Sequence, residues 1–150
     1  MKRISILSLA VIAIFDLQIS NSWAISKAAC RIEVSDVHLS TQIFEQSGNR
    51  AVKVDAYSIC DLPQSKVALT VELWKVGRFS NYKLAASTVN SLGTTLPGKR
   101  VNNFGTFLRC KNSRATRYFG IAYSKAYLDG KWQYARHVQS KEIFPLSCGT

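Results

Sequence analysis

The positions of the cysteines constrain the fold of this 150-residue chain more than any other feature. The chain has four of them, Cys30, Cys60, Cys110 and Cys148. The first two lie at equal distances from Glu45, in a polar stretch, and the last two lie at equal distances from Asp129, which Gly130 follows. Because such residues favour chain reversal, each pair could close the open end of an antiparallel hairpin. The spacing predicts a β domain with two local disulfides.

The N-terminus has the pattern of a signal peptide. Lys2 and Arg3 precede an apolar run over residues 4–15, and small residues flank Trp23 in the sequence Ser22-Trp23-Ala24. The run is too short for the roughly 20 residues that span a bilayer. We therefore expect export rather than a membrane span.

Cleavage after Ala24 would divide the chain into a leader, residues 1–24, and a secreted domain, residues 25–150. Ala28 is a second candidate cleavage site. A lipid anchor on Cys30 is a weaker alternative, because the third residue before it is Lys27 rather than leucine. The expected location is extracellular.

An export signal and an even number of cysteines point to the same oxidising compartment. Each disulfide would contribute about 3–4 kcal/mol by constraining the unfolded chain. A metal site is disfavoured because the sequence has no Cys-x-x-Cys and its two histidines, His38 and His137, stand at unrelated spacing. We expect no metal and no cofactor.

The alternative pairing joins Cys60 to Cys110. With Trp74 between them, these residues have the spacing of an immunoglobulin domain. The apolar alternation from Val67 to Leu73, however, directs Trp74 to the opposite side of its strand. The local pairing, Cys30 with Cys60 and Cys110 with Cys148, is therefore favoured, although spacing alone does not decide connectivity.

Alternation with a period of two continues along the chain, and the leader apart, no segment has a helical pattern. The expected strands are 31–39, 51–59, 66–75, 82–90, 103–110, 117–127 and 131–140. About seven strands at this spacing predict an all-β fold, an antiparallel Ig-like β-sandwich. A partly closed barrel is the alternative.

The last hairpin is the most specific prediction, because Asp129-Gly130 between two alternating strands favours a two-residue type I′ turn. The expected pairs are Tyr127 with Trp132, Lys125 with Tyr134, Tyr123 with Arg136, Ile121 with Val138 and Arg117 with Glu142. This register leaves the cysteines beyond the hairpin one residue out of step. A bulge or a three-residue turn would correct the mismatch.

Hydrolytic chemistry needs a nucleophile with a base, paired acids or a metal. The acids outside the leader are scattered, and no phosphate-binding glycine loop or nucleophile motif is present. One enzymatic hypothesis remains: His38 and His137 could serve as the base and acid of a small basic ribonuclease. The simpler interpretation is that both are ordinary surface side chains, and a non-enzymatic protein is favoured.

The net charge of +11 is large for a domain of this size. It predicts attraction to anionic polymers, acidic glycans or cell-surface components. The densest basic segments are Lys99-Arg100 and the cluster Arg109, Lys111, Arg114 and Arg117. Each could equally be a solvated loop that keeps the protein soluble.

The candidate ligand-binding residues alternate rings and cations near the tip of the last hairpin. They are Tyr123, Lys125, Tyr127, Trp132, Tyr134 and Arg136. Rings can stack on sugars or bases, and the cations can bind anionic groups. The favoured interpretation from the sequence is nevertheless that these rings cap the core, because the expected face continues into Phe119, Ile121 and Val138. Trp74 is a second candidate for an exposed ring.

Several short patterns resemble small exported actinobacterial proteins that lack an assigned function. These are the two local cysteine pairs, Leu73-Trp74-Lys75 followed by Gly77, Lys83-Leu84-Ala85-Ala86 with Ser87, and Cys110 followed by a tyrosine-rich hairpin. The resemblance implies a β-sandwich with two disulfides and transfers no catalytic residue.

Three classes of function are therefore open. A monomeric binding module for an anionic, glycan-bearing or specific protein partner predicts exposed rings at the hairpin. A ribonuclease predicts that the two histidines share a pocket, and a cationic toxin or antimicrobial protein predicts leakage of anionic vesicles. The binding module is favoured.

Overall fold

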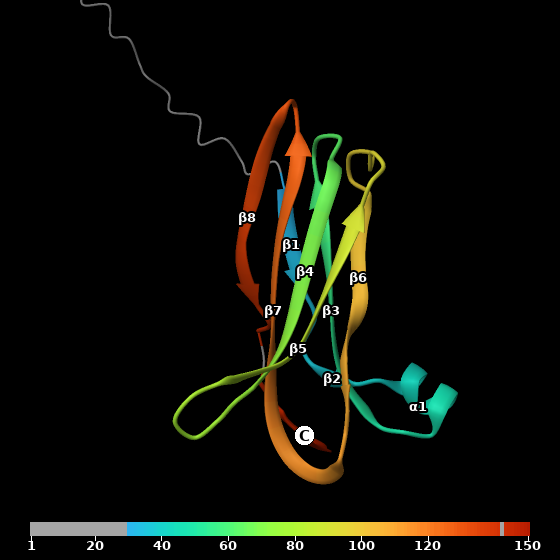
Figure 1. Cartoon of the computed structure of the whole chain (residues 1–150), viewed down its shortest axis with the longest axis vertical. Coiled ribbons are helices and arrows are strands. Elements are labelled where there is room, and N and C mark those ends of the chain that lie inside the picture. The colour runs from blue at the N-terminus through green and yellow to red at the C-terminus, as the bar shows by residue number, and fades with distance from the viewer. Residues whose placement is uncertain (1–29, 142) are drawn as a thin grey trace, which may run out of the picture.

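The computed structural model describes residues 30–141 and 143–150. The expected leader and both expected cleavage sites lie outside these residues. The described residues form nine strands and one helix, shown in Figure 1. The elements are β1 (Cys30–Val34), β2 (His38–Leu39), α1 (Thr41–Ser47), β3 (Ala51–Cys60), β4 (Ser65–Lys75), β5 (Tyr82–Ser91), β6 (Arg100–Arg109), β7 (Asn112–Leu128), β8 (Lys131–Gln139) and β9 (Pro145–Gly149). The protein is mostly antiparallel β structure, as its alternation predicted.

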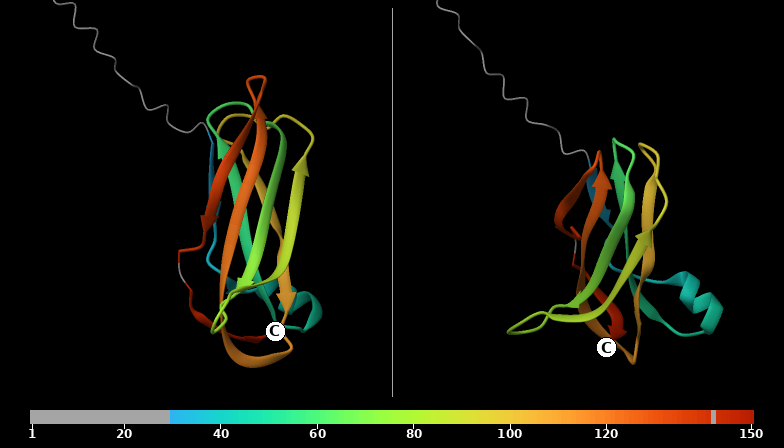
Figure 2. Two further views of the ribbon diagram at one scale, coloured as in Figure 1. Left: turned by 60° about the vertical axis from the view of Figure 1, so that its left-hand side comes forward. Right: turned by 45° about the horizontal axis from the view of Figure 1, so that its top comes forward.

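The strands form two sheets (Figures 1 and 2). In the first sheet, β3 is central, with β1 and β2 along one edge and β6 along the other. The second sheet has the order β5-β4-β7-β8, and β9 pairs with the first part of β7. Because β8 and β9 use successive parts of β7, this strand is the longest in the fold.

The core lies between the two sheets. The inward side chains of β4 are the predicted ones, Val67, Leu69, Val71 and Leu73. Val52 and Val54 of β3 belong to the same core, opposite them. Trp74 has the other phase and is half-buried on the outer side of the second sheet, as predicted.

The inner face of β7 differs from the expectation. Tyr118 and Ala122 belong to the core between the sheets, so Phe119 and Ile121 lie on the outer side of the second sheet. Phe119 is nevertheless buried, as expected, where it stacks against Trp74. Val138 still packs against the core because a register shift places it opposite Ala122 instead of Ile121. The prediction of which side chains face inward was therefore wrong for β7 and right for Val138 of β8.

Both disulfides have the favoured local pairing. Cys30 is bonded to Cys60, its direct partner in the β1–β3 register, and Cys110 is bonded to Cys148. The immunoglobulin-like pairing of Cys60 with Cys110 is wrong. The reason is that Cys60 ends one strand of the first sheet beside Cys30, whereas Cys110 follows β6 and lies beside β9.

The last hairpin turns at the predicted residues, and Asp129 and Gly130 both have positive φ, 45° and 75°. The expected pairs of Tyr127 with Trp132 and Lys125 with Tyr134 are present. The register then shifts between Ala122 and Ser124, so the expected pair of Ile121 with Val138 is wrong, and Ile121 pairs with Gln139. Arg117 pairs with Pro145 of β9, and its expected partner Glu142 lies outside the described residues. A shift of this kind was the expected repair of the cysteine mismatch.

The sequence patterns did not reveal α1 or β9. Ser40 caps α1 by accepting from the Ile43 amide at 3.2 Å, and Gly48 ends the helix with a φ of 68°. No residue of this helix is buried, so it carries no apolar stripe that periodicity could detect. None of the helices among the described residues is long and apolar enough to cross a membrane.

Candidate binding surface

The tip of the last hairpin carries rings in contact with one another and with cations. Tyr127 and Trp132 meet edge-on, with ring centroids 5.5 Å apart. The Lys125 ammonium lies 5.3 Å from the centroid of the Trp132 ring, and the Lys66 ammonium lies 5.4 Å from that of Tyr127. Trp132 is 45 % exposed and Tyr134 is 75 % exposed. These rings are therefore available to a partner rather than buried as a cap on the core.

The register shift places two residues of β8, Arg136 and His137, opposite Tyr123, where one was expected. The ring of His137 packs against that of Tyr123, with centroids 4.6 Å apart. Arg136 lines a cavity of about 540 Å³ at the edge between β1 and β8, together with Arg31 and Ile32. Tyr134 lines the same cavity, so Arg136 adjoins the exposed ring of one other candidate residue.

The same outer face continues onto β4 and β5 through Glu72. This carboxylate is 8 % exposed and accepts from the Trp74 indole nitrogen at 2.8 Å and from the Lys83 ammonium at 3.1 Å. The Tyr123 hydroxyl also donates to it, at 3.4 Å. Glu72 thus links three strands of the sheet and fixes the orientation of the Trp74 ring.

Trp74 extends the row of rings toward the other end of the sheet. It stacks on Phe119 with ring centroids 6.0 Å apart, and the Lys83 ammonium lies 5.9 Å from its centroid. We call this outer face of the β5-β4-β7-β8 sheet the aromatic surface. Its residues are Lys66, Glu72, Trp74, Lys83, Phe119, Tyr123, Lys125, Tyr127, Trp132, Tyr134 and His137.

The sequence predicted the part of the aromatic surface that lies on the last hairpin, but not its continuation across β4. The one available signal was the outward phase of Trp74. The pairing of Trp74 with Phe119, which joins the two halves, is a long-range contact that alternation within each strand does not contain.

The two histidines lie on the outer sides of opposite sheets. The His38 imidazole lies 3.9 Å from the carboxylate of Asp55, on the outer side of the first sheet, and His137 packs on Tyr123 in the second. Because the core separates them, they cannot act together on one phosphodiester bond. No group of three or more potential metal ligands occurs among the described residues.

The outer face of the first sheet also carries charged and aromatic side chains. The Tyr57 hydroxyl donates to Glu33, and the guanidinium of Arg100 lies 4.0 Å from the centroid of the Tyr57 ring. This hydrogen bond, aided by Arg31, holds the pKa of Glu33 below its usual range. The same hydrogen bond raises the pKa of Tyr57. Arg100 is thereby assigned to a local contact rather than to a basic patch.

The basic cluster after β6 divides between two places. Arg109 lies beside α1, in a hollow that Lys53 and Phe107 also line. Arg114 and Arg117 line a different hollow, at the end of the sandwich where β9 meets β7. Four neighbouring cations in the sequence are therefore not one patch.

Comparisons of the chain with models of protein families, with curated proteins and with solved structures found no match. The resemblance to exported actinobacterial proteins stays a prediction.

Proposed function

We propose that this protein is an exported, non-enzymatic binding protein whose aromatic surface binds an anionic glycan at a cell surface. The observation that carries the proposal is the exposed pair of Trp132 and Tyr134 beside Lys125. Flat rings can stack on the apolar faces of sugars, and an adjacent ammonium can pair with a carboxylate, phosphate or sulfate on the same chain. Neither these two rings nor the Lys125 side chain is buried in the core.

The fold supports this assignment. We infer an Ig-like sandwich from the strand order of the two sheets. One sheet has three strand positions, occupied by β1 with β2, by β3 and by β6, and the other has four, occupied by β5, β4, β7 and β8. Fibronectin type III and many cell-surface domains share that two-sheet architecture. Two disulfides are consistent with the oxidising environment that export would provide.

The energetics favour a modest affinity per site. A ring stacked on a ligand contributes about 1–3 kcal/mol in the related case of bases on aromatic side chains. Two exposed rings and one cation therefore support binding in the millimolar to micromolar range. Repeated units of a polymer would strengthen it by avidity.

The experiment is a binding screen of the oxidised protein against uronic-acid glycans, wall polymers, anionic vesicles and RNA at two salt concentrations, with RNA integrity and vesicle leakage recorded in parallel. We expect salt-sensitive glycan binding that the double substitution Trp132→Ala, Tyr134→Ala removes. A matched control is Phe79→Ala with Phe144→Ala, since both rings are exposed and outside the aromatic surface.

Equal loss in the control variant, or glycan binding unaffected by the first pair, would exclude the aromatic surface as the site. RNA cleavage by the pure protein would replace the proposal with a nuclease, and vesicle leakage without glycan binding would replace it with a cationic toxin.

A further inference from the structure

The strongest unassigned feature is a basic hollow at the end of the sandwich near β9. It has a volume of about 550 Å³, within the range of small-ligand sites. Four cationic side chains line it: Lys75, Arg78, Arg114 and Arg117. No Asp or Glu side chain is among its described lining residues. We call this hollow the basic pocket.

Two segments bring these cations together, namely the end of β4 with the loop after it and the first part of β7. Lys75 ends β4 and pairs with Tyr118 of β7, and the next amide, that of Val76, donates to the Arg117 carbonyl at 2.9 Å. The loop after β4 therefore carries Arg78 to the side of β7 that holds Arg117. This juxtaposition depends on sheet pairing, so the sequence cluster around Arg114 did not reveal it.

Close backbone contacts fix two walls of the basic pocket. A Cβ atom on Gly77 would lie 2.0 Å from the Ser80 carbonyl oxygen, and one on Gly149 would lie 1.9 Å from Oδ1 of Asn112. Both glycines line the pocket, and neither position has space for a side chain. The loop after β4 and the end of β9 are therefore held in these positions by packing.

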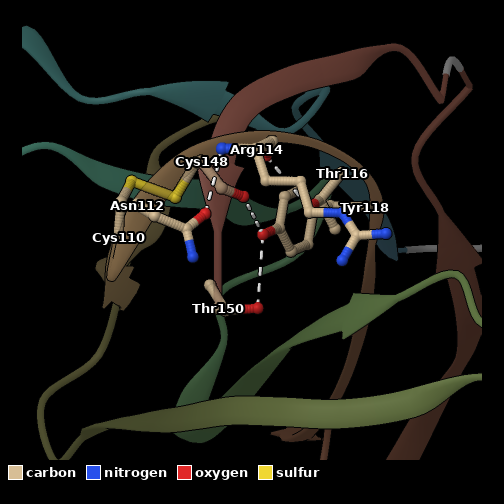
Figure 3. The surroundings of a disulfide bond; sticks show 7 residues. All are labelled: Cys110, Asn112, Arg114, Thr116, Tyr118, Cys148 and Thr150. Carbon is tan, nitrogen blue, oxygen red and sulfur yellow. Dashed lines mark hydrogen bonds between the residues drawn. A yellow bond between two sulfur atoms is a disulfide. The ribbon is translucent and has the colours of Figure 1, made fainter.

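Figure 3 shows how the Cys110–Cys148 end supports Arg114. Oδ1 of Asn112 accepts from the Arg114 amide at 2.9 Å, and the Thr116 hydroxyl donates to the Arg114 carbonyl at 3.2 Å. These bonds use the main chain of Arg114, while its guanidinium extends away from the disulfide (Figure 3).

The charge of the basic pocket is not balanced by its own side chains. Elsewhere Arg31 pairs with Glu33, Lys53 with Asp55 and Lys83 with Glu72. In the pocket, Lys75 donates at 3.0 Å to the main-chain oxygen of Thr150, the last residue of the sequence, whose terminal carboxylate offsets one of the four positive charges. The three arginines face no carboxylate side chain among the lining residues. All three arginines are exposed, and the guanidinium of Arg78 also lies 5.3 Å from the centroid of the Phe79 ring. Like charges around one hollow repel one another, so an anion between them is stabilising. Guanidinium groups match the oxygens of phosphate in bidentate geometry.

We propose that the basic pocket is a phosphate-binding site for a phosphate monoester or diester, held by Arg78, Arg114 and Arg117. The site is distinct from the exposed rings at the tip of the last hairpin and does not rest on the proposed glycan binding. Arg117 and Tyr127 are separated by about 33 Å along β7 at roughly 3.3 Å per residue. One ligand group cannot occupy both places.

The test is a titration of the oxidised protein with inorganic phosphate, glycerol 3-phosphate and a glycerol phosphodiester, at an ionic strength held constant with sodium chloride. NMR signals of the arginine side-chain Nε–H groups report contacts with the ligand, and the melting temperature reports stabilisation of the folded protein by ligand binding. We expect saturable shifts at Arg114 and Arg117 and a rise in melting temperature. A preference for the diester would identify a polymer as the source of the group, and a preference for the monoester would identify a small molecule.

The double substitution Arg114→Gln, Arg117→Gln is expected to weaken phosphate binding by at least about tenfold, the equivalent of one lost charge-assisted hydrogen bond. Arg50→Gln with Arg109→Gln removes the same charge from exposed positions outside the pocket and is expected to change binding less than twofold. If the double variant folds poorly, Arg78→Gln in the loop serves the same purpose. Shifts that are not saturable, or that respond equally to both double variants, would overturn the site.

Discussion

The aromatic surface depends on Glu72, and substitution of this residue is the most informative single change. Its carboxylate accepts from Trp74 at 2.8 Å, from Lys83 at 3.1 Å and from Tyr123 at 3.4 Å. A hydrogen bond to a charged group contributes about 1.5–3 kcal/mol, which applies to the short Trp74 bond. The Lys83 side chain is 51 % exposed, so its ion pair adds only about 0.5 kcal/mol. The Tyr123 contact is at the limit of distance and adds little.

We therefore expect Glu72→Ala to lower the free energy of unfolding by about 2–3 kcal/mol. Glu72→Gln keeps an acceptor oxygen for the indole and should cost only about 1 kcal/mol. Urea denaturation measures both, through the midpoint at an unchanged slope. The indole fluorescence of Trp74 should also change in the alanine variant, because its ring loses the acceptor that orients it.

A double-mutant cycle separates the contributions. Lys83→Met removes the ammonium, and its coupling with Glu72→Ala should be about 0.5 kcal/mol. The reasoning is refuted if Glu72→Ala costs less than about 0.5 kcal/mol, the range of an ordinary surface substitution, or if the glutamine variant is as unstable as the alanine variant.

Two further predictions concern other parts of the fold. A Cβ on Gly120 would lie 2.4 Å from Cγ2 of Val54. Gly120→Ala should therefore lower the free energy of unfolding by about 1–3 kcal/mol in urea denaturation, and by less when Val54 is also replaced by alanine. If the effects of the two substitutions simply add, the steric clash is not the cause. The pKa of Glu33 is lowered mainly by the Tyr57 hydroxyl, so its stabilising contribution is present at neutral pH and is lost as the pH falls through the folded-state pKa. Tyr57→Phe should raise that pKa in an NMR titration, and an unchanged value would show that the hydrogen bond is not its cause.

Local patterns in the sequence were sufficient for the features that depend on neighbouring residues. The turn at Asp129-Gly130 needs only positive φ at two adjacent positions, and the core face of β4 needs only alternation. The two cysteine pairs follow from the strands that they close.

Features that depend on pairing between distant strands could not be predicted in this way. A single register shift placed His137 as well as Arg136 opposite Tyr123, and it is the His137 ring that packs there. Because the side chains of a strand alternate, a shift of one residue exchanges the two faces beyond it. The basic pocket likewise brings Arg78, in the loop after β4, together with Arg117 of β7, and no local pattern links those residues.

The distribution of side-chain size on β7 bears on the proposed function. Its inner face carries small residues at Gly120, Ala122 and Ser124, whereas its outer face carries Tyr123 and Tyr127. Hydrophobic burial alone favours the opposite arrangement, because an aromatic ring stabilises the fold most when it is removed from water. The close approach of Gly120 to Val54 shows that small residues let the two sheets pack tightly here. The rings on the outer face are not required by that packing, and two of the rings on this side of the sheet, Trp132 and Tyr134 of β8, are exposed to solvent. The proposed glycan binding would account for their position, because exposed aromatic groups in one place are typical of interaction sites.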